Sequence, residues 1–248
     1  MIRWTTVFLD RPADGFAAAT EFWSTVTDTT PSPTRGEHDE FATLLPASAD
    51  ACLRIQRTLD GSAGSHIDLH VDDVGASTNA ATDLGATVVE DHDTMVVVRS
   101  PGGLTFCLVA HDGEHERPTP VGAPGARTLV DQVSIDVAPD RFDRECRFWA
   151  ELTGWTLRPG AEPEYAVLER PAGQPFRFLL QRRGAGDAGR PTACHLDLAC
   201  DDIPTAVAAH VALGASVVAP FRWWTVMTDP AGVEYCLTCR DPDTGVPG

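Results

Sequence analysis

The residues best suited to chemistry lie in two short segments that are nearly the same. Residues 194–202 contain His195 and Asp197 with one apolar residue between them, and residues 65–73 contain His66 in the same setting. Polar and apolar residues alternate through both segments, which is typical of a β-strand with one buried face. An imidazole and a carboxylate on one strand face can bind a divalent metal ion, move protons or hydrogen-bond to each other. Which of these roles applies depends on the residues that the neighbouring elements bring close to the two strands.

The similarity extends well beyond these strands. Each segment runs through two consecutive aspartates into an alanine-rich helix that ends at Leu-Gly-Ala, and then into two strands, the last containing Cys-Leu. Over residues 65–108 and 194–237, roughly 16 of 44 aligned positions are identical without a gap. We therefore interpret the chain as a tandem duplication. In the first copy, Asp73 is expected to cap the helix and Gly85 to end it in a left-handed conformation.

Composition excludes several classes of function. The 248-residue chain has a net charge of −17, so nucleic acid and anionic membrane surfaces are not expected partners. All 19 basic residues are arginine, which excludes Schiff-base chemistry, pyridoxal-phosphate anchoring and a P-loop lysine. Seven cysteines, an odd number spread over predicted strands and helices, indicate reduced thiols and a cytoplasmic protein. No apolar run of membrane length is present, and no signal peptide is expected.

The remaining pattern predicts a matching set of elements in each half. In the first half we expect strands at 4–10, 41–45 and 52–57, a helix at 14–26 and a proline loop at 31–33. In the second half we expect a strand at 130–137, a helix at 141–153, and strands at 155–157, 165–170 and 176–182. Phe148-Trp149 in the second helix corresponds to Phe22-Trp23 in the first.

These elements predict an α+β fold of two tandem domains, residues 1–112 and 129–248, joined by a Pro/Gly-rich linker at 113–128. Each domain would consist of two paired βαβββ units that form a curved, cup-like sheet with helices outside. His111, His115 and the nearby acids could hold a metal ion, but a solvated charge run is the preferred interpretation. His70 has no counterpart in the second copy and is interpreted as incidental.

Strand alternation sorts the side chains of the second domain between two faces. Apolar residues should face the helices, which leaves a polar set on the concave face. That set contains Gln132, Ser134, Asp136, Gln181, His195, Asp197, Glu234 and Cys236. Polar atoms inside a cup need partners, which a metal ion, water or substrate would supply.

The chain resembles the vicinal oxygen chelate superfamily, and most closely its glyoxalase-like, bleomycin-resistance-like branch. The resemblance is carried by Phe148-Trp149, by His195-Leu-Asp-Leu with Asp201-Asp202, by Leu213-Gly214-Ala215, and by Asp229-Pro-Ala-Gly-Val-Glu-Tyr-Cys-Leu237. It covers nearly the whole chain twice. The family includes isomerising lyases, dioxygenases, epoxide-opening transferases and drug-binding proteins.

The resemblance implies where a metal would bind. The ligand positions of metal-dependent members correspond to Gln132, Gln181, His195 and Glu234 in the second domain. The corresponding positions of the first domain hold Thr6, Gln56, His66 and Thr105, so a degenerate site without metal is expected there. Zn, Ni, Mn or Fe would be the metal, and no organic cofactor is implied.

Two functions remain open at this stage. The first is a metal-dependent lyase, isomerase or dioxygenase-type enzyme that acts on a small oxygen-chelating substrate, with Glu234 as proton carrier. The second is a metal-free protein that sequesters a small molecule, as bleomycin-resistance proteins do. The candidate substrate-binding residues are Trp155, Tyr165, Trp223, Trp224, Asp197 and Cys236, with core packing as the alternative role of the aromatic residues. A scaffold without a ligand is a third interpretation, and the protein is expected to be a monomer or homodimer.

Overall fold

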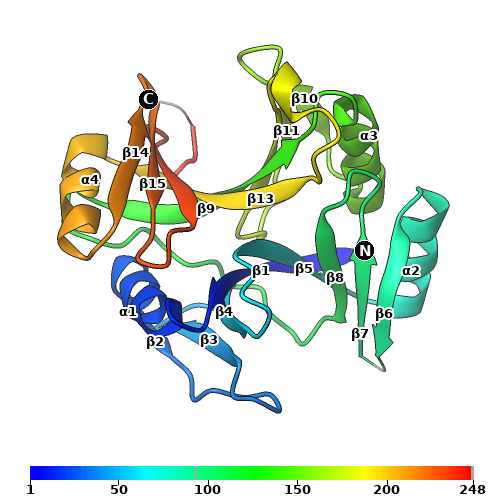
Figure 1. Ribbon diagram of the computed structural model, residues 1–248, viewed down its shortest axis with the longest axis horizontal. Coiled ribbons are helices and arrows are strands. Elements are labelled where there is room, and N and C mark those ends of the chain that lie inside the picture. Colours follow the sequence, from blue (N-terminus) through cyan, green and yellow to red (C-terminus); the bar gives the residue numbers. More distant parts are fainter. Residues whose placement is uncertain (93, 247–248) are drawn as a thin grey trace. The chain divides into compact units, whose positions relative to one another are not determined.

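Residues 1–92 and 94–246 are described by the computed structural model, which folds into two eight-stranded sheets (Figure 1). The strands of the first sheet are β1 (Ile2–Pro12), β2 (Thr29–Pro31), β3 (Phe41–Pro46), β4 (Leu53–Thr58), β5 (Gly64–Val71), β6 (Thr87–His92), β7 (Met95–Arg99) and β8 (Thr105–Ala110). Those of the second are β9 (Thr128–Val137), β10 (Leu157–Pro159), β11 (Tyr165–Leu168), β12 (Arg177–Arg182), β13 (Ala193–Cys200), β14 (Ser216–Pro220), β15 (Trp224–Thr228) and β16 (Glu234–Thr238). Residues 247–248, the end of the predicted second domain, lie outside the described residues.

Four α-helices accompany the sheets within the described residues. They are α1 (Phe16–Val26), α2 (Val74–Asp83), α3 (Phe142–Thr153) and α4 (Ile203–Ala212), and a short 3₁₀ helix covers Ala185–Asp187. None of these helices is both long and apolar enough to cross a membrane.

The two sheets have the same strand order. The first is β2-β3-β4-β1-β5-β8-β7-β6, and the second is β10-β11-β12-β9-β13-β16-β15-β14. In each, β1 and β5 or their equivalents β9 and β13 lie at the centre, where the two βαβββ units of that half meet. The predicted α+β fold with two tandem domains and curved, open sheets is therefore confirmed (Figure 1).

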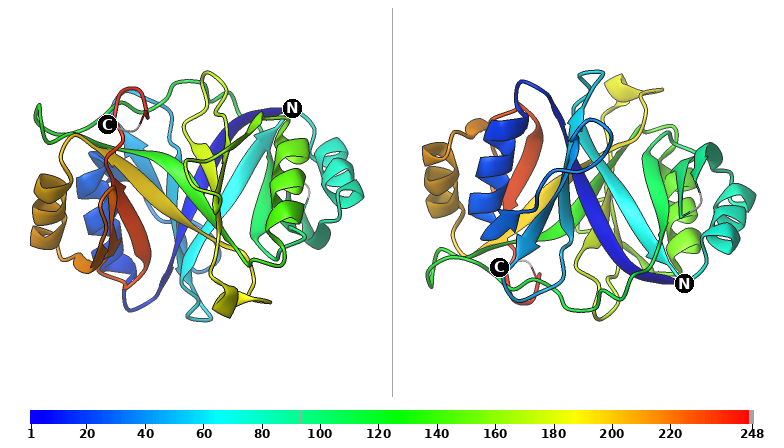
Figure 2. Two further views of the ribbon diagram at one scale, coloured as in Figure 1. Left: turned by 90° about the horizontal axis from the view of Figure 1, so that it is seen from above. Right: turned by 90° about the horizontal axis from the view of Figure 1, so that it is seen from below.

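The chain forms two compact units, and their boundaries differ from the boundaries of the two sheets. One compact unit, unit 1, contains Met1–Val7, His66–His115 and Val133–Cys194, and the other, unit 2, contains Phe8–Ser65, Glu116–Gln132 and His195–Gly248. Each unit combines elements of both sequence halves: α1 lies beside β16 in unit 2, and α2 lies beside α3 in unit 1 (Figure 2). The boundaries predicted at 1–112 and 129–248 follow the sheets, and as domain boundaries they stay a prediction.

Aromatic side chains form the core of each unit. In unit 2 the ring of Tyr235 on β16 lies 5.8 Å from Phe22 and 5.2 Å from Trp23 of α1. In unit 1 the ring of Phe106 on β8 lies 5.1 Å from Trp149 of α3. The paired Phe-Trp motif of the two helices therefore covers the last strand of the other sequence half. Such burial of large aromatic surface is a main source of stabilisation.

The predicted ends of the repeated helices are confirmed. The Asp73 carboxylate accepts a hydrogen bond from the backbone of Ala76 at 2.9 Å, and Gly85 has a φ of 96° after α2. In the second copy Asp202 caps α4 in the same way through Thr205, also at 2.9 Å. An extended aspartate at this position satisfies one of the free N–H groups of the first helical turn.

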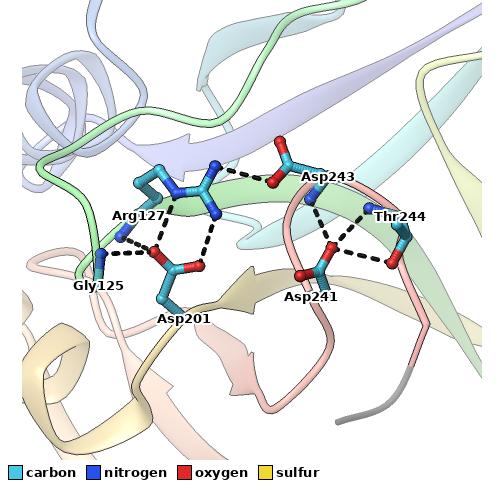
Figure 3. A network of polar contacts seen from close by, with 6 residues as sticks. All are labelled: Gly125, Arg127, Asp201, Asp241, Asp243 and Thr244. Atoms are coloured by element: carbon cyan, nitrogen blue, oxygen red, sulfur yellow. Dashed lines mark hydrogen bonds and ion pairs between the residues drawn. The ribbon is translucent and has the colours of Figure 1, made fainter.

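The first aspartate of each acidic pair holds the start of a central strand. Asp201 accepts hydrogen bonds from the guanidinium of Arg127 at 3.0 Å and from the backbone N–H of Gly125 at 3.1 Å, and Arg127 also reaches Asp243 at 2.8 Å (Figure 3). The hydrogen bonds from Arg127 lower the pKa of the Asp201 carboxyl. Asp72 binds Arg3 in the first copy, at 2.7 Å. The end of the linker is thus fixed to the second domain.

Some element boundaries differ from the predicted ones. The first helix begins at Phe16 rather than residue 14, because the chain makes a turn at Gly15, where an added Cβ would lie 2.6 Å from Ala231. The strand predicted at 155–157 is Leu157–Pro159 instead, so Trp155 precedes it. A short strand, Thr29–Pro31, precedes the predicted proline loop, shares its first residue and pairs with β3. These short edge strands carry too few residues for alternation to be read from sequence.

Candidate metal centre in the second domain

Strand β13 presents His195 and Asp197 on one face of the second sheet. The alternate residues Leu196 and Leu198 point to the opposite face, where both are buried. Alternation along the strand makes this separation, because successive side chains project to opposite sides. The Nε2 atom of His195 lies 3.3 Å from Oδ1 of Asp197. The sequence-predicted pairing of imidazole and carboxylate is therefore present.

The neighbouring strand β16 adds a thiol. It runs parallel to β13 with Asp197 opposite Cys236, and Sγ of Cys236 lies 3.6 Å from Nε2 of His195. One nitrogen, one oxygen and one sulfur atom thus lie within 4.8 Å of one another. In a tetrahedral zinc site, bond lengths near 2.0–2.3 Å would separate nitrogen from oxygen by about 3.4 Å and nitrogen from sulfur by about 3.6 Å. The cluster fits a divalent ion of borderline softness.

Asp197 is held in place by two further side chains of unit 2. The Gln132 amide on β9 donates a hydrogen bond to Oδ2 of Asp197, and the Arg240 guanidinium lies 3.9 Å from the same oxygen. Arg240 is also hydrogen-bonded to buried Asp131. Burial disfavours the charge on Arg240, but the carboxylates of Asp131 and Asp197 outweigh it and raise the pKa of the guanidinium. Two carboxylates and one guanidinium leave a net negative charge beside His195.

A family model named "Glyoxalase-like domain" matches residues 6–109 and 132–238. The chain belongs to this glyoxalase-like family. Each of the two matched regions corresponds to one of the two sheets, and the two regions are called the first and the second glyoxalase-like domain below. A comparison with curated protein sequences finds no match.

Solved structures with the same fold include enzymes of the vicinal oxygen chelate superfamily. A 2,2',3-trihydroxybiphenyl 1,2-dioxygenase from Sphingomonas wittichii is similar at 15% identity and a TM-score of 0.64, over 96% of this chain and 90% of that one. A Mn(II)-bound glyoxalase from Novosphingobium aromaticivorans gives 18% identity and a TM-score of 0.62, over 98% and 83% of the two chains. At these identities the likeness shows the fold.

Of the four predicted metal ligands, His195 and Gln132 both lie next to Asp197. Gln132 donates a hydrogen bond to the Asp197 carboxylate, and His195 lies 3.3 Å from it. Glu234 opens β16 two residues before Cys236; it is exposed and is not part of the cluster of three ligand atoms. It lies on the same strand face as Cys236, since Thr228 and Val226 oppose them in the β15–β16 ladder. Gln181 lies on β12 opposite Tyr165, in unit 1. The ligand roles of Glu234 and Gln181 stay predictions.

Asp197 and Cys236, predicted as substrate-binding residues, are the two that join His195. The signal for Cys236 was present in the sequence, because Cys107 occupies the same position of the first copy. Alternation alone does not separate Glu234 from Cys236, since residues two apart share a strand face. The pairing register makes that distinction.

The predicted aromatic walls have different surroundings. Trp224 lies on the face of Cys236, as the opposing pairs Trp224–Thr238 and Val226–Cys236 show, and it stacks on Phe221 at 4.8 Å. Trp223 is 48% exposed beneath the Arg222 guanidinium. Trp155 is buried with its ring 5.0 Å from Phe178, which favours core packing for this residue. Tyr165 is half-buried at the start of β11.

The first glyoxalase-like domain contains a matching cluster. His66, Asp68 and Cys107 place one nitrogen, one oxygen and one sulfur atom within 4.8 Å of one another, and Asp68 opposes Cys107 in the β5–β8 ladder. The predicted asymmetry rested on Thr105 replacing Glu234 and on Thr6 replacing Gln132, yet none of these residues belongs to the two clusters. The two domains differ instead in distance: His66 Nε2 lies 3.9 Å from Asp68 Oδ1, compared with 3.3 Å in the second domain.

Proposed function

We propose that the second domain binds one divalent metal ion through His195, Asp197 and Cys236 and that the protein is a metal-dependent enzyme of the vicinal oxygen chelate type. The observation that carries this proposal is the spacing of the three ligand atoms, 3.3 Å and 3.6 Å from the shared imidazole nitrogen. Zn, Fe, Ni and Mn are the candidate metals, with the thiolate favouring the first three. The substrate would be a small molecule with two neighbouring oxygens.

The residues around the cluster have separable tasks in this proposal. When bound, the metal would supply Lewis-acid stabilisation of negative charge on the substrate oxygens. Gln132 orients the Asp197 carboxylate through its amide N–H. Trp224 offers an aromatic surface on the same face as Cys236 for an apolar part of the substrate. Glu234, which is exposed and lies two residues before Cys236, would exchange protons between the site and water.

One observation favours the second candidate function, a metal-free binding protein. Gln132 donates a hydrogen bond to the Asp197 carboxylate, and Arg240, which is shared with Asp131, lies 3.9 Å from it, so protein groups alone already contact this carboxylate. A protein of this kind would use the same face, with Trp224 as its aromatic wall, to retain a small molecule without converting it.

Elemental analysis of untagged protein purified without chelator tests the proposal. We expect near-stoichiometric divalent metal, reduced by His195→Ala and by Cys236→Ser, and turnover of a catechol or α-hydroxy ketone that is lost in both variants. Cys239→Ser is the matched control, because this half-exposed cysteine directly follows β16 and is not part of the cluster. Protein that stays metal-free after soaking, or a Cys236→Ser variant with wild-type metal content, would contradict the metal site and favour the binding protein.

A further inference from the structure

Three potential metal ligands of unit 1 meet at the carboxyl ends of β5 and β8. His70 lies near the end of β5, His111 directly follows β8, and Glu114 comes three residues later. One carboxylate oxygen of Glu114 lies 3.5 Å from Nδ1 of His70, and the other lies 3.3 Å from Nδ1 of His111. The three groups offer ligand atoms within 4.8 Å of one another.

The fold brings these residues together in a defined way. Strands β5 and β8 are parallel neighbours, so their carboxyl ends share one edge of the first sheet (Figure 1). The backbone N–H of His111 donates to the carbonyl of Val71 at 3.1 Å, which fixes the chain as it leaves β8. Gly113 then adopts a φ of 103°, a left-handed conformation that suits glycine, and the chain turns back. The Asp112 N–H donates to Glu114 Oε2 at 3.3 Å and orients the carboxylate.

The inner histidine is the most constrained member of the cluster. His70 is 2% exposed, and its Nε2 atom lies 3.1 Å from the hydroxyl of buried Thr6 on β1. A hydrogen bond at one ring nitrogen fixes the orientation of an imidazole, as it does for metal-ligating histidines in proteins. His111 and Glu114 are about one-fifth exposed, so an ion held by all three residues could keep a water ligand.

This cluster is separate from the His66 cluster on the same strand. His66 and His70 share a strand face but are four residues apart, which corresponds to about 13 Å along an extended strand. The counterpart of His70 in the second domain is Ala199, so this cluster is not part of the repeated pattern. The interpretation of His70 as incidental and of residues 111–115 as a solvated run missed it, because these segments are 40 positions apart in sequence.

We propose that His70, His111 and Glu114 form a second divalent-metal site, which takes Zn²⁺ or another borderline ion and ties the start of the linker to the first sheet. Two neutral imidazoles and one carboxylate are ligands that zinc prefers. His70 and His111 each lie next to a different oxygen of Glu114, at 3.5 Å and 3.3 Å, and each separation is close to the value of about 3.4 Å between two ligand atoms of a tetrahedral zinc ion. The site is independent of the proposed centre at His195.

Cobalt titration of the full chain in a Cys107→Ser, Cys236→Ser background tests this site. Without these thiols, any Co²⁺ bound at the clusters of His66 or His195 lacks sulfur-to-metal charge-transfer absorption. We expect visible Co²⁺ bands from which His111→Ala and Glu114→Gln remove the contribution of one bound ion, and a Zn²⁺-induced rise in Tm that Glu114→Gln reduces. Thr6→Val should weaken binding about 10–100-fold, as loss of an outer hydrogen bond does.

His92→Ala is the matched control, because His92 forms an exposed His–Glu pair with Glu90 at 3.2 Å. It should leave the Co²⁺ bands and the Zn²⁺ effect on Tm unchanged. If His111→Ala and Glu114→Gln bind Co²⁺ as tightly as their parent, or if the parent binds none, Glu114 serves only as a hydrogen-bonded bridge between two histidines and the proposal is wrong. These measurements do not test the proposed centre at His195, whose metal content is determined separately by the His195→Ala and Cys236→Ser variants.

Discussion

At the scale of single residues, buried carboxylates organise both compact units. In unit 2 the Asp229 carboxylate accepts hydrogen bonds from Arg11 at 2.6 Å and from Trp23 at 2.9 Å. In unit 1 Glu145 accepts one from Trp149 at 2.9 Å and one from the backbone of Gly102. Each carboxylate thus binds a helix tryptophan. A buried charge is tolerated only when it is paired and hydrogen-bonded.

Removing one partner of the Arg11–Asp229 pair should destabilise the protein strongly. Both side chains are almost fully buried, and burial lowers the pKa of Arg11 against the opposing effect of Asp229. Asp229→Ala would leave the guanidinium uncompensated, which typically costs about 3–5 kcal/mol of unfolding free energy. Urea unfolding measures this loss, and Glu169→Ala, which removes the partner of exposed Arg158, is the control with no measurable change expected. A loss in Asp229→Ala no larger than in the control would refute the structural role.

At the scale of elements, α4 packs a histidine onto α1 and β16. His210 is 3% exposed; its Nδ1 lies 2.8 Å from the Tyr235 hydroxyl, and its ring lies 5.5 Å from that of Phe22. Burial lowers the pKa of His210 to about 4, from an ordinary value of 6.5. The imidazole is therefore neutral at physiological pH and belongs to the core of unit 2.

This histidine should make stability depend on pH. Between pH 6.5 and 4 the unfolded chain binds a proton at His210 that the folded chain does not, so stability is full above pH 6.5 and falls as the pH drops towards 4. The loss should be on the order of 3 kcal/mol. We expect His210→Gln to flatten the curve of unfolding free energy against pH in this window, and exposed His92→Gln to leave it unchanged. Equal slopes for wild type and His210→Gln would exclude His210 as the cause.

At the scale of the whole molecule, the sequence repeat predicts the two sheets, but it does not predict which helix packs on which sheet. Period-2 alternation and the capped helices around Asp73 and Asp202 were sufficient to predict two equivalent curved sheets. Alternation shows which face of a strand is apolar, but it does not show which helix covers that face. The contacts of Tyr235 with Phe22 and Trp23 join residues more than 200 positions apart, and no local pattern encodes such a pairing.

The same limit applies to the sites. His195 and Asp197 were found from the pattern of one strand, whereas the choice of Cys236 over Glu234 as their neighbour required the register between β13 and β16. The cluster of His70, His111 and Glu114 required a loop that folds back through a left-handed glycine. Local pattern therefore predicted the strand that carries a site, and tertiary pairing selected the remaining members.

The last prediction concerns the two sequence halves expressed separately. Unit 2 packs α1 of the first half on β16 of the second, and unit 1 packs α3 of the second half on β8 of the first. Either half alone would expose the aromatic residues that meet at these contacts, including Trp23 in residues 1–112 and Trp149 in residues 129–248. Exposed apolar patches of this kind favour association or aggregation.

We therefore expect each half alone to lack a fixed near-ultraviolet circular dichroism signal or to self-associate, and an equimolar mixture to recover the signal of the full chain as a one-to-one complex. Analytical ultracentrifugation of the halves and of the mixture measures the association. Phe22→Ser in the first half is the accompanying variant, because it removes a ring from the Tyr235 contact and should weaken the complex. Two monomeric halves that each unfold cooperatively, with no association on mixing, would show that the sheets are autonomous domains and that the contacts of α1 and α3 with the other half add little stability.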